Sequence, residues 1–177
     1  PYLIDGPNMV IGTRTNPIQP NIPKILFGNM PNDGGNLILS EEEKIQLLEK
    51  EPAANKYIRP FMGAEEFING GKRWCLWLFD AAPQELRSIT EIAQRIRQVQ
   101  EYRLKSTRPT TRNLAGSPSL FGEIRQPHSR YIIFPRHSSE TRRYIPLGYL
   151  NPDIIVHDSC RALSNATLYH FGVLTSA

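Results

Sequence analysis

A strand is expected at Lys72-Arg73-Trp74-Cys75-Leu76-Trp77-Leu78-Phe79, a segment with almost no alternation of polar and apolar residues. Strands with both faces covered have this pattern. Trp74 and Trp77 could stack on nucleic-acid bases, but inside such a run we expect them to be part of a core. The 40% hydrophobic content of the 177-residue chain is typical of a globular protein.

Helices are expected on both sides of this strand. Ser40 and Glu43 form a capping-box pattern, and the helix that follows should end before Pro52, with an apolar face of Ile45, Leu47 and Leu48. Residues 53–58 and 63–68 are expected to add short helical turns, the first closed by Arg59-Pro60.

The longest helix should begin near Pro83 or Ser88 and end at about Ser106. Its apolar residues recur every three or four positions, as one buried stripe requires: Ile89, Ile92, Ala93, Ile96, Val99 and Leu104. Four basic residues lie off the stripe and are expected to be exposed: Arg95, Arg97, Arg103 and Lys105. A short helix over residues 110–115 should follow.

The remaining pattern predicts short strands joined by polar loops. Strand candidates are residues 9–11, 24–27, 36–39, 123–125, 131–134, 144–149, 153–156 and 166–171. The polar linkers are residues 126–130, 135–143 and 157–165. The glycine-rich segment 28–35 lacks the Lys-Ser/Thr ending and the following helix of a phosphate-binding loop, so an irregular loop is expected. The predicted fold is α+β, an irregular mixed β-sheet with an adjoining helical lobe at about residues 40–115.

Positive charge is concentrated in residues 101–143. This segment holds nine basic and three acidic residues, a net charge of +6, in a chain whose total is +4. Eight of the nine are arginine, whose planar guanidinium suits bidentate contacts with phosphate and guanine. A solvated surface is the alternative explanation.

The sequence offers no catalytic or metal-binding pattern. His157, Cys160 and either His128 or His137 match no standard zinc spacing, and the His-Ser neighbours lack the context of a nucleophile. Cys75 and Cys160 lie in different surroundings, so we expect free thiols in a reducing cytoplasm. Because the chain opens at Pro1 without methionine and stops just after the apolar residues 168–174, we expect a fragment of a longer protein.

A nucleic-acid reader fits the composition better. It needs cations for phosphates and polar groups for base edges, and residues 108–143 supply both, the polar groups being Asn113, Gln126, His128, Ser129, His137 and Ser138. Helix-turn-helix, zinc-finger and aromatic RNA-binding signatures are absent. Two alternatives stay open. An RNA-binding module would stack single strands on exposed aromatics such as Tyr102, Tyr131 and Tyr149, and a protein-interaction domain would use the basic stretch only for solvation.

Four segments carry a resemblance to a known family. They are Gly28-Asn29-Met30-Pro31-Asn32-Asp33-Gly34-Gly35, Lys56-Tyr57-Ile58-Arg59-Pro60-Phe61-Met62-Gly63-Ala64-Glu65-Glu66-Phe67-Ile68, Leu120-Phe121-Gly122-Glu123-Ile124-Arg125-Gln126-Pro127 and Asn165-Ala166-Thr167-Leu168-Tyr169-His170-Phe171-Gly172. They resemble the target-recognition region of class I S-adenosylmethionine-dependent adenine-N6 DNA methyltransferases, in particular the MmeI-like (type IIG) restriction–modification enzymes.

The resemblance implies a DNA-recognition domain without catalytic residues. The family's cofactor loop and Asn-Pro-Pro-Tyr/Phe motif are missing, and Asn151-Pro152-Asp153 lacks the second proline and the aromatic. The chain itself should hold no cofactor and no metal, and S-adenosylmethionine should bind the methyltransferase domain of the parent protein, with or without a fused endonuclease. Residues 1–22 would connect to that domain, and residues 23–177 would be the recognition domain, with its basic β/loop region at about 116–177. The expected partners are double-stranded DNA and the parent's methyltransferase domain, without a membrane, in a bacterial or archaeal cytoplasm.

Loop side chains read DNA in that family, which points to loops 105–113, 125–130, 136–143 and 157–165. The base-reading candidates are His128, Ser129, Arg130, Arg136, His137, Ser159 and Arg161. The phosphate-binding candidates are Lys105, Arg108, Arg112, Arg142 and Arg143. Arg125 could instead pair with Glu123 or Glu140, and His170, in an apolar strand, could be a satisfied core histidine.

Overall fold

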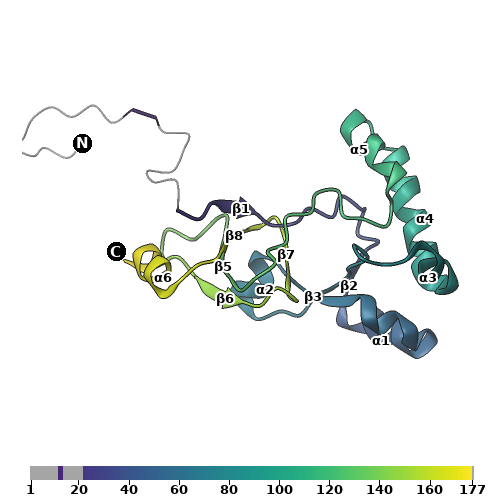
Figure 1. Cartoon of the computed structure of the whole chain (residues 1–177), viewed down its shortest axis with the longest axis horizontal. Coiled ribbons are helices and arrows are strands. Elements are labelled where there is room, and N and C mark those ends of the chain that lie inside the picture. Colours follow the sequence, from purple (N-terminus) through teal and green to yellow (C-terminus); the bar gives the residue numbers. More distant parts are fainter. Residues whose placement is uncertain (1–11, 14–21, 177) are drawn as a thin grey trace, which may run out of the picture.

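Two four-stranded sheets form the centre of the computed structural model, which describes residues 12–13 and 22–176 (Figure 1). The first sheet is antiparallel, in the order β1 (Ile25–Phe27), β8 (Cys160–Ser164), β5 (Tyr131–Pro135) and β6 (Gly148–Leu150). The second is mixed, in the order β2 (Ile38–Leu39), β4 (Trp74–Leu76), β3 (Ile58–Met62) and β7 (Ile155–Val156), with β3 and β7 parallel. The predicted α+β class is confirmed.

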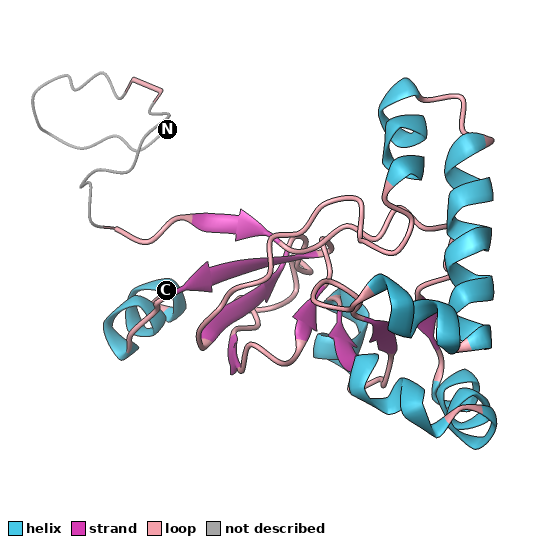
Figure 2. Ribbon diagram, turned by 45° about the vertical axis from the view of Figure 1, so that its right-hand side comes forward, coloured by secondary structure: helices cyan, strands magenta, loops and turns pink. Residues whose placement is uncertain are grey.

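Most helices gather at one end of the molecule (Figures 1 and 2). They are α1 (Glu41–Lys50), α3 (Pro83–Ser88), α4 (Thr90–Leu104), α5 (Pro109–Asn113) and the 3-10 turns η1 (Pro52–Tyr57) and η2 (Leu114–Gly116). Helix α2 (Ala64–Asn69) lies beside the sheets, and α6 (Leu168–Thr175) lies near the far end of the first sheet.

The sequence signals for α1 and α4 are confirmed in most respects. Ser40 and Glu43 make both hydrogen bonds of the capping box. Ile92 and Val99 are fully buried, as their stripe predicts. Ile45 in α1 and Leu104 in α4 are exposed, however, so the buried sides of both helices are narrower than expected.

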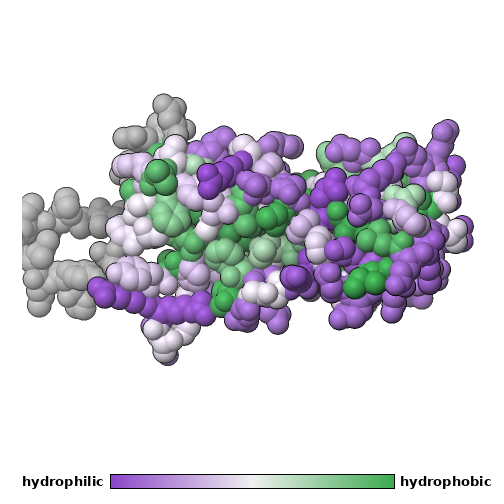
Figure 3. Space-filling view, turned by 90° about the horizontal axis from the view of Figure 1, so that it is seen from below, coloured by the Kyte–Doolittle hydropathy of each residue, from purple (hydrophilic) through white to green (hydrophobic). Residues whose placement is uncertain are grey.

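The protein has two adjoining hydrophobic cores. The larger packs α1, α3 and α4 against the second sheet and contains Phe61, Leu76 and Ile92. The smaller contains Tyr131 and Cys160 and lies under the first sheet. Each fully buried large apolar side chain contributes about 1.5–3 kcal/mol. On the face in Figure 3, hydrophobic residues gather in the centre and hydrophilic residues dominate toward the helical end.

The start of segment 28–35, Gly28 and Asn29, connects the two sheets. The Asn29 N–H donates to Val156 O at 2.7 Å, and the Asp158 N–H donates to Asn29 O at 2.9 Å. A Cβ on Gly28 would lie 2.2 Å from His157 O, so only glycine permits this close approach. The segment that we expected to be an irregular loop is therefore hydrogen-bonded to the chain between β7 and β8.

Several sequence-based assignments in the C-terminal half are wrong. Residues 166–171 form no strand: α6 begins at Leu168, because Asn165 turns the chain with φ of 56° and Thr167 caps the helix. Strand β8 lies where a linker was expected. Residues 123–125 make only an isolated bridge between Glu123 and Met30, and only the last part of 144–149 is in β6.

Two further assignments concern the N-terminal half. Ile58–Met62 is strand β3, where Arg59-Pro60 had indicated only the end of a helical turn; pairing with β4 outweighs the local proline signal. The strand expected at residues 9–11 lies outside the described residues, as does most of the proposed connector 1–22.

Candidate nucleic-acid interface

Three arginines surround the ring of Phe27 on the first sheet. The guanidinium carbon of Arg161 lies 3.5 Å from the ring centroid, that of Arg136 5.0 Å and that of Arg125 5.8 Å. Phe27 is opposite Arg161 in the β1–β8 register, and Arg161 is opposite Phe134 in the β5–β8 register. Opposite residues of paired strands lie on one side of a sheet, so this side presents both aromatics with Arg161 between them. We call Phe27, Arg125, Arg136 and Arg161 the Phe27 cluster.

Two of the three charges in the Phe27 cluster have carboxylate partners. Arg125 pairs with Glu123, one of its two expected partners, and Arg136 lies 3.7 Å from Asp158. The Arg161 side chain has no hydrogen-bond or salt-bridge partner within the described residues. Its guanidinium is thus fixed by stacking and keeps its donors available.

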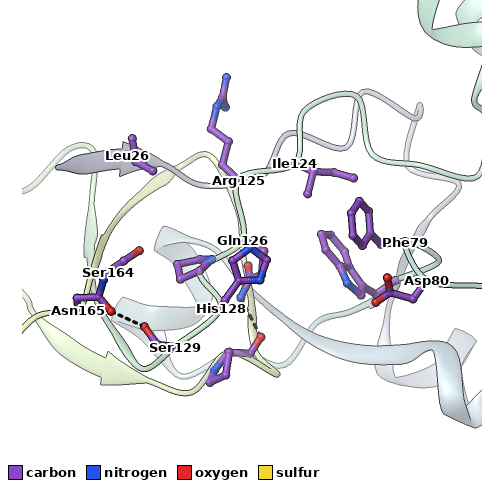
Figure 4. Close-up of a pocket in the computed structure, with 13 residues that line it drawn as sticks. Leu26, Phe79, Asp80, Ile124, Arg125, Gln126, His128, Ser129, Ser164 and Asn165 are labelled. Atoms are coloured by element: carbon purple, nitrogen blue, oxygen red, sulfur yellow. Dashed lines mark hydrogen bonds between the residues drawn. The ribbon is translucent and has the colours of Figure 1, made fainter. Parts of the chain in front are cut away.

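A groove of about 1000 Å³ lies on the other side of strand β1. Successive residues of a strand point to opposite sides, and Leu26 lines the groove whereas Phe27 lies among the arginines. The remaining walls come from the chain after β4, from loop 124–129, from Pro152 and from the end of β8 with the turn that follows it. In Figure 4 the Arg125 side chain points away from the cavity, so Arg125 stands at the boundary between groove and cluster.

The groove presents aromatic and polar side chains together. Trp77 and Phe79 line it, because β4 ends at Leu76 instead of continuing to Phe79 as predicted, and Phe79 is exposed. His128 and Ser129 also line it, and Ser129 Oγ lies 3.0 Å from Asn165 Oδ1 (Figure 4). A groove of this composition can contact both flat rings and hydrogen-bonding edges.

Gln126 supports the groove instead of reaching out from it. Its Oε1 accepts from Asn29 Nδ2 at 2.8 Å and from Val156 N at 3.0 Å, and its Nε2 donates to the carbonyls of Pro152 and Ile154. The amide is therefore fully used within the protein. The prediction that Gln126 offers a polar group to base edges is wrong, because its amide is hydrogen-bonded within the protein.

Arg103 is also used internally, contrary to its expected exposure. It is 1% exposed, and its guanidinium donates to five backbone carbonyls, those of Pro31, Asn32, Leu114, Ser117 and Leu120. The side chain extends from α4 to two segments, residues 31–32 and 114–120, and donates to their backbone carbonyls. It fastens these segments to the helix and is unavailable to a ligand.

The other base-reading candidates are distributed over the same sheet and its loops. His128, Ser129, Arg130, Arg136 and His137 are exposed, whereas Ser159 and Arg161 are partly buried. Arg130 lies over the ring of Tyr149 in β6, with its guanidinium carbon 4.3 Å from the ring centroid, and forms another arginine–aromatic pair. The structure places Arg136 with Arg161, and His128 with Ser129; His137 lies apart on the loop after β5.

Ser159 belongs to a polar group behind the Phe27 cluster. Its hydroxyl oxygen lies 3.0 Å from the donating N–H of Ala64 and 2.8 Å from His157 Nδ1, and its own N–H donates to that nitrogen at 3.2 Å. The other ring nitrogen of His157 lies 3.1 Å from Asp158 Oδ1. Burial lowers the pKa of His157, although the Asp158 carboxylate opposes this effect. This network holds the turn that leads into β8 and Arg161.

The phosphate-binding candidates form two groups, all exposed. Lys105, Arg108 and Arg112 are at the end of α4 and in α5, away from β1 and β8 in Figures 1 and 2. Arg112 folds back on the carbonyls of Ser106 and Thr107. Arg142 and Arg143 lie on the loop between β5 and β6.

Sequence reasoning missed Phe27, Arg125 as part of a cluster, and Asn29. The alternation within strand 24–27 would have put Phe27 on the opposite side from Leu26, but nothing local predicts that Arg136 and Arg161 meet it. His170, expected in a core strand, instead caps α6 through Thr167, with its Nδ1 accepting from the Thr167 N–H at 3.1 Å. Across the described residues no helix is long and apolar enough to span a bilayer, and no three His, Cys, Asp or Glu side chains are grouped to hold a metal ion.

These features define the class of protein as an α+β module that presents stacked arginines and an aromatic groove around one sheet. Residues 5–177 match the family model described as the MmeI target recognition domain, and the chain belongs to that family. It is 40% identical over 176 residues to DNA methyltransferase A of Bacillus subtilis (strain 168), covering 99% of this chain and 20% of that protein. A solved structure of the type IIL restriction–modification enzyme MmeI in complex with DNA matches 97% of this chain and 23% of its own, with a TM-score of 0.90 and 40% identity. The chain thus spans about a fifth of the length of these relatives.

Proposed function

We propose that the chain is the sequence-specific duplex-DNA recognition domain of an adenine-N6 DNA methyltransferase in a restriction–modification system. The strongest support is the match, at a TM-score of 0.90, to an enzyme solved in complex with DNA. Methyl transfer and S-adenosylmethionine binding would belong to a methyltransferase domain elsewhere in the parent protein, and the parent would be a type IIG enzyme of a bacterial or archaeal cytoplasm. Residues 23–177 would recognise DNA and residues 1–22 would connect the two domains.

The side chains divide into two roles. Arg130, Arg136 and Arg161 would contact guanine edges, for which a bidentate arginine is the commonest partner. His128, Ser129, His137 and Ser159 would contact other bases. Of these, Ser159 has its hydroxyl engaged with Ala64 and His157, so it would act through its neighbours or after rearrangement.

The phosphate contacts would come from two separate places. Lys105, Arg108 and Arg112 would bind from the α4–α5 end, and Arg142 and Arg143 from the β5–β6 loop. Phosphate contacts fix the register of a protein on a duplex without carrying sequence information. Two groups of phosphate contacts on different elements would fix the orientation of the domain on the duplex, which one group alone could not do.

The arrangement of aromatic residues argues against single-stranded RNA as the ligand. Tyr131 is fully buried, Tyr149 is stacked with Phe171 at 5.6 Å, and Tyr102 lies against Gly34 at the helical end. These three rings form no common stacking platform. Arg161 argues against a surface that binds only proteins, because its positive charge has no carboxylate partner within the described residues.

Mapping methylated bases in DNA exposed to the intact parent protein tests the proposal. We expect one asymmetric sequence to be methylated at adenine N6, and exchange of Arg130, Arg136 or Arg161 to change or relax single positions of it. Arg97→Gln is the matched control, because Arg97 is exposed on α4 and its side chain makes no hydrogen bond or ion pair within the described residues. If all three exchanges leave the methylated sequence and the activity unchanged, the assignment of base readers is wrong.

A further inference from the structure

Phe27 occupies an unusual place for a large aromatic residue. It ends β1, the edge strand of the first sheet, and it stays 36% exposed while three guanidinium groups lie within 6 Å of its ring. Neither hydrophobic core includes it. Three arginines therefore surround a ring that belongs to neither core.

The geometry at Arg161 is that of a stacked guanidinium. Its guanidinium carbon lies over the aromatic face, 3.5 Å from the ring centroid. Stacking of this kind is worth about 0.5–2 kcal/mol and leaves the in-plane N–H donors free. A long arginine side chain loses little further entropy on binding when it is already held in one orientation.

The charges around the ring favour an anionic ligand. Glu123 and Asp158 offset Arg125 and Arg136, but Arg161 has no such partner in the part of the chain that the structure describes. With three arginines and two carboxylate partners, the cluster keeps one uncompensated positive charge, which favours an anionic ligand. Phe27 keeps the arginines together in the absence of that ligand.

We propose that Phe27 is a positioning residue for base reading: its ring holds the guanidinium of Arg161, with Arg136 beside it, in the orientation that donates two hydrogen bonds to a guanine edge. The proposal rests on the proposed function and adds a residue to which no role in binding has been given. Phe27 itself contacts no base. It acts through Arg161, so its removal affects discrimination between bases more than the attraction to phosphates.

The test compares Phe27→Leu, which removes the aromatic face, with Phe27→Tyr, which keeps it. The intact protein is bound to duplexes carrying its own recognition sequence and to duplexes with one guanine of that sequence replaced. For Phe27→Leu we expect the discrimination ratio at one guanine to fall about 3- to 30-fold, with the salt dependence of binding unchanged, and for Phe27→Tyr we expect a ratio near that of the unsubstituted protein.

Arg161→Lys is the second variant, which keeps the charge but loses the planar fork. It should lose discrimination at the same guanine as Phe27→Leu, and the double variant should lose little more than either alone. If Phe27→Leu fails to fold, full discrimination retained by Arg161→Lys still overturns the proposal.

The proposal is overturned if Phe27→Leu or Arg161→Lys retains full discrimination. It is also overturned if Phe27→Tyr loses as much as Phe27→Leu, because the ring would then have only a packing role. A different result marks failure of the proposed function: an unsubstituted protein that binds all duplexes alike.

Discussion

The side-chain amide of Asn29 donates to Gln126 Oε1 at 2.8 Å, and both residues are fully hydrogen-bonded between the two sheets. Asn29 Nδ2 also donates to Val156 O at 2.9 Å, and Asn29 Oδ1 accepts from the Arg125 N–H at 2.7 Å. Asn29 itself is completely buried. This pair anchors the loop that carries Arg125 on one side and His128 on the other.

Replacing Gln126 with leucine should destabilise the protein by about 2–4 kcal/mol. The substitution leaves Asn29 Nδ2 and the Val156 N–H short of an acceptor, and each unsatisfied buried group costs about 1–3 kcal/mol. The free energy of unfolding from urea titration measures the effect. The control is Gln98→Leu on the exposed side of α4, which should change it by less than about 0.5 kcal/mol. Equal effects of the two substitutions would contradict the anchoring role.

Arg103 should be more important for stability than for binding. Arg103→Met removes the donors for five carbonyls, and hydrogen bonds from charged groups are worth about 1.5–3 kcal/mol each, so we expect a loss of more than about 3 kcal/mol. Arg103→Lys should recover only part of it, since one ammonium cannot reach all five acceptors. Thermal unfolding gives the measurement, with Arg97→Met as the exposed control. A stable Arg103→Met protein that has lost only DNA affinity would restore Arg103 to the interface.

The sequence predicted best where one local signal governs the structure. The capping box at Ser40 starts α1, and the stripe through Ile92 and Val99 is buried in α4. The number of arginines pointed to a basic surface, but it did not show that Arg103 is buried in the protein while Arg161 is available to a ligand. The first meets five carbonyls from loops about ten and seventy residues away, and the second meets an aromatic ring on another strand.

Long-range pairing explains the rest of the errors. Strand β8 lies between β1 and β5 in the first sheet. Its polar residues, Arg161 and Ser164, led us to expect a linker at this place. Residues 166–171 are apolar like a strand, but Thr167 and His170 supply a helix cap that outweighs the composition. The meeting of Phe27 with Arg136 depends on both pairings of β8, which no short-range pattern contains.

Stability should fall as the pH drops through the titration of His157. Burial lowers the pKa of this ring below its ordinary value of 6.5, against the opposing effect of Asp158 and with a contribution from Arg73. The unfolded chain therefore takes up a proton at higher pH than the folded protein. The stabilisation from neutral His157 is complete above about pH 6.5 and is lost as the pH falls through the lower folded-state pKa.

Urea titrations between pH 7.5 and about 5 check this effect. His157→Gln should give a shallower fall in the free energy of unfolding over this range than the unsubstituted protein. The control Gln98→Leu, which changes no titratable group, should give the same slope as the unsubstituted protein. A His157→Gln slope as steep as that of the unsubstituted protein would assign the pH dependence to other groups.

The two groups of phosphate-binding candidates should differ from the Phe27 cluster in their response to salt. Neutralising Arg142 and Arg143 together should weaken binding to every duplex alike and lower the slope of log K against log salt by about 1.8, since each phosphate contact contributes about 0.9. Lys105→Gln with Arg108→Gln should act in the same way from the α4–α5 end, whereas Arg161→Lys should leave the slope unchanged. Binding measured from about 50 to 200 mM salt on specific and unrelated duplexes gives these slopes. An unchanged slope for the Arg142 and Arg143 pair would remove the β5–β6 loop from the interface, because two exposed cations that touch phosphates cannot be lost without changing the number of released counterions.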